Sequence, residues 1–424
     1  MTTDTTSPHE RVLTALSHRQ PDRAPVDFGG TFVTGIHITC VAALRDYFGL
    51  KKRPVKVLDA GQMLGEVDDE LKERLGVDVE GLLRRTSRFG FPNSDWKPWK
   101  FFGGLEIAVP GGFNPSTDAN GDILLHPGGD HSLPASARMP ANGYFFDNIV
   151  RQHPIDEDKL DPKDNLEEYG PVSEEELTFL EKESRRARAT GRVVAAGFGG
   201  TALGDIGSIP APWLRDPKGI RDITEWYMSI RSRRPYIHRM LEGQCEIALA
   251  NLKRIAARVG DTVDVVYICG TDFGTQNSSF CSVATFRELW LPYYKAINSW
   301  IHKNAKWKTF KHSCGAIAKF LPSLIEAEFD ISNPVQCSAE GMDPATLKRN
   351  FGSELVFWGG GVDTQSVLPF GTPAEVREQV LRRCEIFAPD GGFVFSTVHN
   401  VQARTPIPNI IAMIEAVKEF NGAS

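Results

Sequence analysis

The sequence predicts an α/β fold, and within that class a (β/α)8 barrel of the TIM type. Its length of 424 residues suits one large barrel with insertions. Short apolar runs rich in β-branched and aromatic residues recur along the chain, as expected of strands that are buried on both faces. In the second half, amphipathic patterns separate these runs, which indicates a parallel sheet. An open doubly wound sheet is the alternative, but no Gly-x-Gly-x-x-Gly fingerprint opens a helix after a strand.

The individual elements follow from composition and period. Seven segments have the character of buried strands, namely 23–28, 192–198, 263–270, 307–312, 329–335, 354–360 and 392–399. Four segments have the period of amphipathic helices, namely 283–304, 315–327, 372–387 and 406–420. Strand followed by helix, repeated, is the pattern of right-handed crossovers in a parallel sheet.

Two stretches depart from this rhythm. Residues of about 38–77 have helical patterns and are expected to form a helical N-terminal extension. Residues of about 98–147 are rich in glycine, proline, asparagine and aspartate, and Asn120-Gly121 is a type I′ hairpin signal. We expect a β-hairpin insertion there, near the barrel mouth, which would act as a lid or as a structural flap. The whole chain, 1–424, is then one barrel domain.

Charge and cysteine content narrow the class of function. A net charge of −6 gives no basic field for nucleic acid or for an anionic membrane. The sequence has no run of 18 apolar residues and no basic start followed by an apolar stretch, so we predict a cytoplasmic protein with a small-molecule substrate. Seven scattered cysteines, an odd number, argue against a disulfide framework and leave thiols free for a metal.

Polar residues follow most of the predicted strands, where a parallel barrel binds its ligand. They are Asp27, Asp272, His312 with Cys314, Asn333 with Gln336, Asp363 and His399. His312 and Cys314 lie two apart in an extended segment, so their side chains point to one side, and zinc accepts imidazole and thiolate ligands. His399, after the last predicted strand, would be the third ligand, and three ligands with one open position are typical of catalytic zinc. Otherwise His312 caps a strand by hydrogen bonding and Cys314 packs as a small apolar residue.

Six further residues are candidates for substrate chemistry. Asp272 would accept a proton or orient the substrate, and Gln276 would recognise a polar substrate group. The predicted substrate-binding residues at the barrel mouth are Asp27, His37, Gln336 and Asp363. Glycines beside Asp27 and Asp363 allow close approach of a ligand to the main chain. Tight turns at the barrel rim are the alternative for each of these segments.

Several of these segments resemble a known family. The opening ERVL and QPDRAPV, and later KHSCGAI, FDISNPVQCSAEGMDPATLKRNFG, VFWGGGVDTQ and GGFVFSTVHNVQARTPIPNI, resemble the uroporphyrinogen decarboxylase superfamily. The later segments are similar to its corrinoid-linked methyltransferase branch. The resemblance implies a distorted (β/α)8 barrel with one zinc ion per chain. It implies methyl transfer between a corrinoid and a thiol, or from methylated substrates such as aryl methyl ethers. The His-x-Cys pair of that branch falls on His312 and Cys314.

Two departures from the family pattern affect the expected reaction. The later cysteine ligand of the branch is replaced here by His399, and neutral imidazole in place of thiolate raises the net charge of the zinc site by one. The ion would be a stronger Lewis acid and its bound thiolate a poorer nucleophile, which favours demethylation, hydrolysis or a lyase reaction. The decarboxylase of the family holds its substrate with an arginine-rich N-terminal segment. No arginine lies between Arg23 and Arg45, which disfavours decarboxylation of a polycarboxylate.

We therefore predict a zinc-dependent, methyltransferase-like enzyme that acts on a small methylated or hydroxylated substrate, by methyl transfer or O-demethylation. A corrinoid would arrive on a separate carrier protein, because no Asp-x-His-x-x-Gly segment is present to hold one. A decarboxylase or lyase that uses Asp27 and Asp272 without metal is the alternative enzyme. A non-catalytic protein that binds a corrinoid or tetrapyrrole is the alternative outside enzymes. No nucleic acid or membrane partner is expected, and assembly into a homodimer stays open.

Overall fold

The barrel sheet contains seven parallel strands. The computed structural model describes residues 6–82 and 84–422. The seven strands are β3 (Val79–Gly81), β10 (Val193–Ala196), β11 (Val265–Cys269), β12 (Lys308–His312), β13 (Ile331–Asn333), β14 (Val356–Trp358) and β15 (Phe393–Val394). They lie in the order β15-β14-β13-β12-β11-β10-β3, and every neighbouring pair is parallel. An α/β fold with a curled parallel sheet is thereby confirmed.

The segment 24–28, within a predicted strand, closes this sheet. Val26 forms a parallel bridge with Phe395, just past β15, and the Asp27 N–H donates to the Phe395 carbonyl over 2.8 Å. On its other side the Asp78 N–H, next to β3, donates to the Val26 carbonyl over 2.8 Å. The segment thus lies between β15 and β3 and occupies the eighth position of a barrel.

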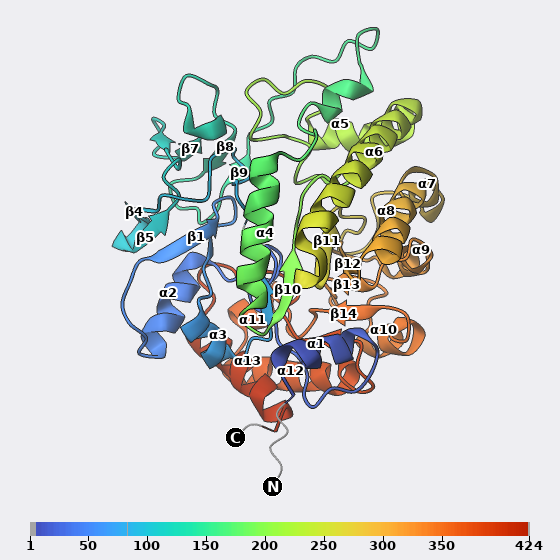
Figure 1. Cartoon of the computed structure of the whole chain (residues 1–424). Helices are drawn as coiled ribbons and strands as arrows, with labels where there is room; N and C mark the ends of the chain where they lie inside the picture. Colours follow the sequence, from blue (N-terminus) through green and yellow to red (C-terminus); the bar gives the residue numbers. More distant parts are fainter. Residues whose placement is uncertain (1–5, 83, 423–424) are drawn as a thin grey trace.

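Apolar side chains fill the barrel interior. Alternate residues of the strands, such as Val193, Val265 and Phe310, form one buried cluster with Val12 and Leu16 of α1 (Pro8–Leu16). Because α1 packs at the amino ends of the strands, it closes that end of the barrel (Figure 1). The loops after the strands form the opposite end, where parallel barrels bind ligands.

Helices cover the outside of the barrel and bury a second, larger apolar cluster against the strands. They are α4 (Glu174–Arg188), α5 (Ile223–Ser232), α6 (Arg234–Val259), α7 (Val283–Leu289), α8 (Leu291–Asn304), α9 (Leu321–Glu326), α10 (Pro344–Phe351), α11 (Val367–Phe370), α12 (Pro373–Phe387) and α13 (Ile407–Phe420). The segment 283–304, predicted as one helix, is divided at Trp290 into α7 and α8. Pro292 lacks the N–H of a helix interior and is tolerated only in the first turn of α8.

The two segments outside the barrel pattern, about 38–77 and about 98–147, contain more strands than the sequence predicted. Between α2 (Ile38–Tyr47) and α3 (Asp69–Leu75) lie β1 (Val55–Asp59) and β2 (Leu64–Gly65). These join β4 (Lys97–Lys100) and β5 (Glu106–Val109) in a sheet of order β2-β1-β5-β4. A second sheet, antiparallel, contains β6 (Ser116–Thr117), β7 (Ile123–Leu125), β8 (Ala137–Met139) and β9 (Asp147–Asn148). Residues 98–147 thus contain parts of two sheets in place of a single hairpin.

The turn at Asn120-Gly121 does join two antiparallel strands, β6 and β7. It is not a type I′ turn, because only Gly121 has a positive φ, of 81°. The Gly121 N–H donates to the Asp118 carbonyl, and the Asp118 N–H donates to the Asp122 carbonyl. The connection is therefore a longer loop than the two-residue signal predicted.

The helices α1–α13 include none with the length and apolar character to cross a membrane, within the residues that the structure describes.

Candidate metal centre and its cavity

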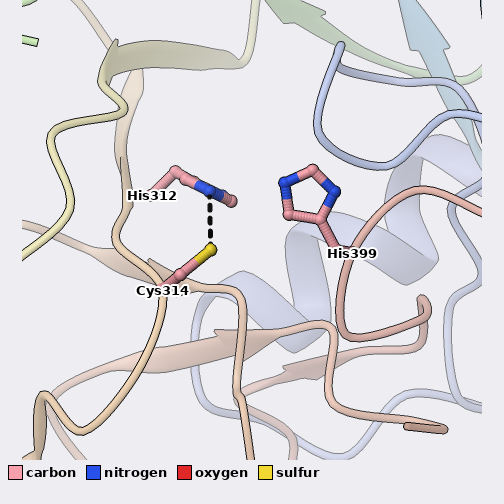
Figure 2. Close-up of side chains that lie close together, drawn as sticks. All are labelled: His312, Cys314 and His399. Atoms are coloured by element: carbon pink, nitrogen blue, oxygen red, sulfur yellow. Dashed lines mark hydrogen bonds between the residues drawn. The ribbon is translucent and has the colours of Figure 1, made fainter. Parts of the chain in front are cut away.

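Three side chains with metal-binding chemistry meet at the open end of the barrel. His312 is the last residue of β12, Cys314 follows two residues later, and His399 lies in the segment after β15. One ligand atom from each residue lies within 4.8 Å of the other two (Figure 2). The sequence suggested these residues from two strand ends, and the structure brings them together.

The hydrogen bonds of Asn333 determine which nitrogen of His312 is free. Asn333 is paired with His312 across β12 and β13, and its Nδ2 donates to the Trp358 carbonyl over 2.7 Å. Its Oδ1 therefore faces His312 Nδ1, 2.6 Å away, and since this oxygen only accepts, Nδ1 carries the proton. The lone pair of Nε2 is left facing Cys314 Sγ, 3.3 Å away. This is the tautomer that a metal ligand binding through Nε2 requires.

Two loops hold Cys314 in place. Its N–H donates to Asp272 Oδ1 over 2.7 Å, and the N–H of Gly315 donates to Gln336 Oε1 over 2.8 Å. Gln336 Nε2 in turn donates to Gln276 Oε1 over 2.9 Å. The structure thus gathers Asp272, Gln276 and Gln336 around the metal-binding loop. Of the three, only Asp272 also lies on the wall of the adjoining cavity.

His399 turns one ring nitrogen, Nε2, toward the other two residues (Figure 2). Its Nδ1 accepts a hydrogen bond from the Asn400 N–H over 2.8 Å, so the neutral ring carries its proton on Nε2. Ligation through Nε2 would move this proton to Nδ1 and remove that hydrogen bond, at a cost of about 1 kcal/mol. Structural zinc contributes on the order of 10 kcal/mol in small domains, so the lost hydrogen bond does not prevent binding.

Burial sets the charge state of the three side chains. It lowers the pKa of both His312 and His399 to about 4, so both imidazoles are neutral at pH 7. Burial, together with the Asp272 carboxylate, raises the pKa of the Cys314 thiol well above its ordinary value. Two neutral imidazoles and a thiol that a metal would deprotonate are a donor set suited to zinc.

A cavity of about 600 Å³ adjoins the cluster, and His312, His399 and Asp272 lie on its wall. Four aromatic residues also line it, namely Phe32, Tyr169, Trp213 and Tyr267. A second cavity, of about 450 Å³, shares four residues of this wall, namely Phe32, Asp59, Arg84 and Tyr267.

Asp27, predicted to contact substrate, lies on neither cavity wall. It is fully buried, its Oδ1 accepts from the Gly30 N–H over 2.8 Å, and its Oδ2 accepts from Trp358 Nε1 over 2.9 Å. Burial raises the pKa of this carboxyl to about 6. Asp27 therefore has a structural role: it links the segment 24–28 to Trp358 of β14 and to the turn at Gly30.

His37 and Asp363 also lie outside the two cavity walls. His37 caps α2: its Nδ1 accepts from the Thr39 N–H, and its Nε2 contacts the Tyr144 carbonyl over 2.8 Å. Asp363 accepts three hydrogen bonds from residues that follow it in a turn. The turn given as the alternative for the Asp363 segment is what the structure has there, whereas the helix cap formed by His37 was not predicted.

Two arginines on the cavity wall were not among the predicted site residues. Arg84 and Arg88 lie in the loop after β3, at the same end of the barrel as the metal cluster. Because β3 has only three residues and was not predicted, nothing in the sequence marked this loop as part of the mouth. Had β3 been predicted, Arg84 and Arg88 would have been candidates, because they follow the end of a barrel strand.

Comparisons with known proteins agree with this architecture. A family model described as uroporphyrinogen decarboxylase (URO-D) matches residues 129–420, which include all three residues of the cluster. No curated protein matches the sequence. A solved structure, a methyltransferase from Methanosarcina mazei, has a TM-score of 0.53 and 13% sequence identity over 98% of this chain and 99% of that chain. At this identity the likeness concerns the fold. The match to the family model covers more than half of the sequence, and the chain therefore belongs to the uroporphyrinogen decarboxylase family.

Proposed function

We propose that this protein is a zinc-dependent enzyme that removes or transfers a methyl group from a small methylated or hydroxylated substrate. The observation that supports this most directly is the cluster of His312, Cys314 and His399 beside a cavity at the open end of the barrel. The fold of the protein is also that of a solved methyltransferase.

The three residues of the cluster would hold the zinc ion. A bound zinc ion with an open position would act as a Lewis acid on a substrate oxygen or thiol. Asn333 keeps the proton of His312 on Nδ1, and Asp272 holds the main chain of Cys314. These contacts fix two of the ligands before any metal arrives, which lowers the cost of binding it.

Asp272 would also orient the substrate. Asp272 lies on the cavity wall. Of its two carboxylate oxygens, Oδ1 accepts a hydrogen bond from the Cys314 N–H, and Oδ2 has no partner among the described residues. Its second oxygen is thus left to accept a hydrogen bond or a proton from the substrate. Gln276 and Gln336 act further out, because they support the Gly315 main chain.

The cavity has the size of a small-molecule site, about 600 Å³. We propose that a corrinoid, as methyl acceptor, comes on a separate carrier protein. Decarboxylation or a lyase reaction without metal, the alternative, would need Asp27 and Asp272 together. Asp27 has both oxygens occupied in the interior, which favours the metal-dependent reaction.

Metal content and turnover test this proposal. The purified full chain should contain about one zinc per chain by elemental analysis. Cys314→Ala and His399→Ala should lose most of it. The matched controls, Cys281→Ala and His153→Ala, change residues outside the cluster and should keep it.

Methyl transfer is followed by the visible absorbance of methylcobalamin formed from cob(I)alamin and a panel of aryl and alkyl methyl ethers. Turnover with at least one ether, lost in Cys314→Ala and kept in Cys281→Ala, is the expected result. Zinc loss to the same extent in all four variants would contradict the assignment of the ligands. Corrinoid binding without turnover of any ether would favour a non-catalytic binding protein.

A further inference from the structure

We propose that Arg84, with Arg88 beside it, binds a carboxylate group of the substrate in the cavity next to His312 and His399. The substrate is then a small carboxylic acid with a flat, apolar body. This inference deepens the proposed function by naming the substrate class. It rests on the proposed function only for the reaction that follows binding.

Both arginines face the cavity from one loop. They follow β3, and the cavity that they line also reaches His312, His399 and Asp272. A ligand held by the arginines would therefore occupy the same space as one that approaches the metal cluster. Since ligands of parallel barrels bind at this end, the placement fits a substrate site.

Arg84 has no partner for its guanidinium among the described residues. Its main-chain carbonyl accepts a hydrogen bond from Asn93 Nδ2 over 2.9 Å. The guanidinium lies over the Phe32 ring, with Cζ 4.4 Å from the ring centroid. On another side is Gly197, where an added Cβ would lie 3.1 Å from Arg84 Nη2. The guanidinium therefore lies against an aromatic ring, and its exposed donors are free to bind a ligand.

The nearby carboxylates do not neutralise Arg84 by direct contact. Asp205 accepts from the N–H groups of Gly207 and Gly270, and Asp59 accepts from the N–H of Gln62. Neither forms an ion pair with Arg84 within the described part of the chain. Arg84 is exposed to solvent, and Asp59 and Asp205 attract its charge without contacting it.

Arg88 adds a second group of free donors. Its Nη2 donates to the Gly207 carbonyl over 2.8 Å, while its Nε is buried without a partner in the described structure. Native proteins pair nearly all buried polar groups, so an unpaired guanidinium nitrogen on a cavity wall indicates a missing acceptor. Two arginines on one wall, both with free N–H groups, make that acceptor an anion.

The geometry favours a carboxylate over a phosphate. Four acidic side chains share the wall with the two arginines and would repel a dianion, namely Asp59, Glu168, Asp205 and Asp272. A carboxylate carries one charge, and its two oxygens match the fork of a guanidinium. The rings of Phe32 and Tyr267, with centroids 4.5 Å apart, give the cavity an apolar surface suited to a flat ligand body.

The test compares acids with their amides. Benzoate, 4-methoxybenzoate and cyclohexanecarboxylate are titrated into the full chain by isothermal calorimetry, each beside its neutral amide, with inorganic phosphate as a further probe. At least one acid should bind about 10- to 100-fold more tightly than its amide, as expected of a charge-assisted hydrogen bond. Arg84→Met should remove this preference, and Arg84→Lys should keep a fraction of it.

Arg85→Met is the matched control, because Arg85 lies in the same loop but pairs with Glu175 on the outside. It should bind the acids as the natural chain does. The titrations are repeated with zinc-free protein, so that binding to the arginines is measured apart from binding to the metal. A preference that survives in Arg84→Met, or the lack of preference for any acid in the natural chain, would overturn the proposal. Tighter binding of phosphate than of every acid would overturn the carboxylate assignment. If the purified protein contains no zinc and still prefers acids in a way that depends on Arg84, this inference holds and the proposed function is wrong.

Discussion

Replacing Asp330 by asparagine should destabilise the protein in a pH-dependent way. Asp330 lies just before β13 and accepts four hydrogen bonds: from His302 Nε2 (2.8 Å), Lys308 Nζ (2.8 Å), and the Thr309 N–H (2.8 Å) and Oγ1 (3.1 Å). Burial alone would raise the pKa of this carboxyl, but the hydrogen bonds from His302, Lys308 and Thr309 outweigh it and bring the pKa to about 2.

The size of the effect follows from that pKa. An aspartate in the unfolded chain has a pKa of about 4. Asp330 in the folded protein therefore binds a proton nearly two factors of ten more weakly than in the unfolded chain. At about 1.4 kcal/mol for each factor of ten, Asp330 contributes about 2.5 kcal/mol at neutral pH. The pKa is lowered by folding, so this contribution is complete above about pH 4 and is lost as the pH falls toward 2. The hydrogen bond to Asp330 raises the pKa of His302, whose share is complete below its unfolded pKa of about 6.5 and is lost as the pH rises.

Urea unfolding of the natural chain and of Asp330→Asn, measured at several pH values, checks this expectation. The difference in unfolding free energy should be largest between about pH 4 and 6.5 and should fall to about half by pH 3. The matched control is Asp261→Asn, because the exposed pair of Asp261 with Lys306 should contribute less than about 1 kcal/mol. A difference for Asp330→Asn that is the same at pH 3 and pH 5 would refute the assignment to the ionised carboxylate.

Three further substitutions test other parts of the structure. Asn333→Ala removes the acceptor that keeps the proton on His312 Nδ1 and should weaken zinc binding by about 10- to 100-fold in competition with a chelator; an unchanged affinity would show that the tautomer is set by something else. Gly315→Ala places a Cβ 2.5 Å from the main chain of the neighbouring loop at a φ of 86°, and should destabilise the protein by about 2 kcal/mol in urea unfolding, so a neutral result would contradict the close approach of the two loops. Thr372→Ala removes the side chain that caps α12 by accepting from the Glu375 N–H, and a loss of about 1 kcal/mol is expected, whereas an unchanged urea midpoint would mean that the cap does not contribute.

The sequence was informative where a strand is long or strongly apolar. Apart from β12, the runs that became β10 to β15 are mostly apolar and carry few charges, because helices cover one face and the barrel interior the other. β3 was not predicted because it is the short sequence Val79-Glu80-Gly81 and contains a charged residue. Glu80 is buried there because it pairs with Lys72 and Arg186. A partner 106 residues away in the chain cannot be read from the local pattern.

The same limit explains the outcome for the site residues. The spacing of His312 and Cys314 is a local property, and it placed both side chains together at the strand end as the structure has them. Asp27 also follows a strand, but its oxygens are taken by Gly30 and by Trp358, a residue far away in the sequence. The sequence therefore does not distinguish a polar residue at a strand end that faces the cavity from one that faces the interior. The roles of His37, Gln336 and Asp363 in substrate binding stay predictions that the structure does not favour.

The closure of the barrel by the segment 24–28 has a consequence for how the site is built. Val26 pairs with Phe395, so the sheet is completed only when residues near the two ends of the chain meet. Such contacts of high sequence separation form late in folding. His399 enters the cluster four residues beyond that pairing, so the third side chain arrives with the event that seals the barrel. A chain shortened before β15 would lose this histidine and leave two unpaired sheet edges, which are templates for aggregation.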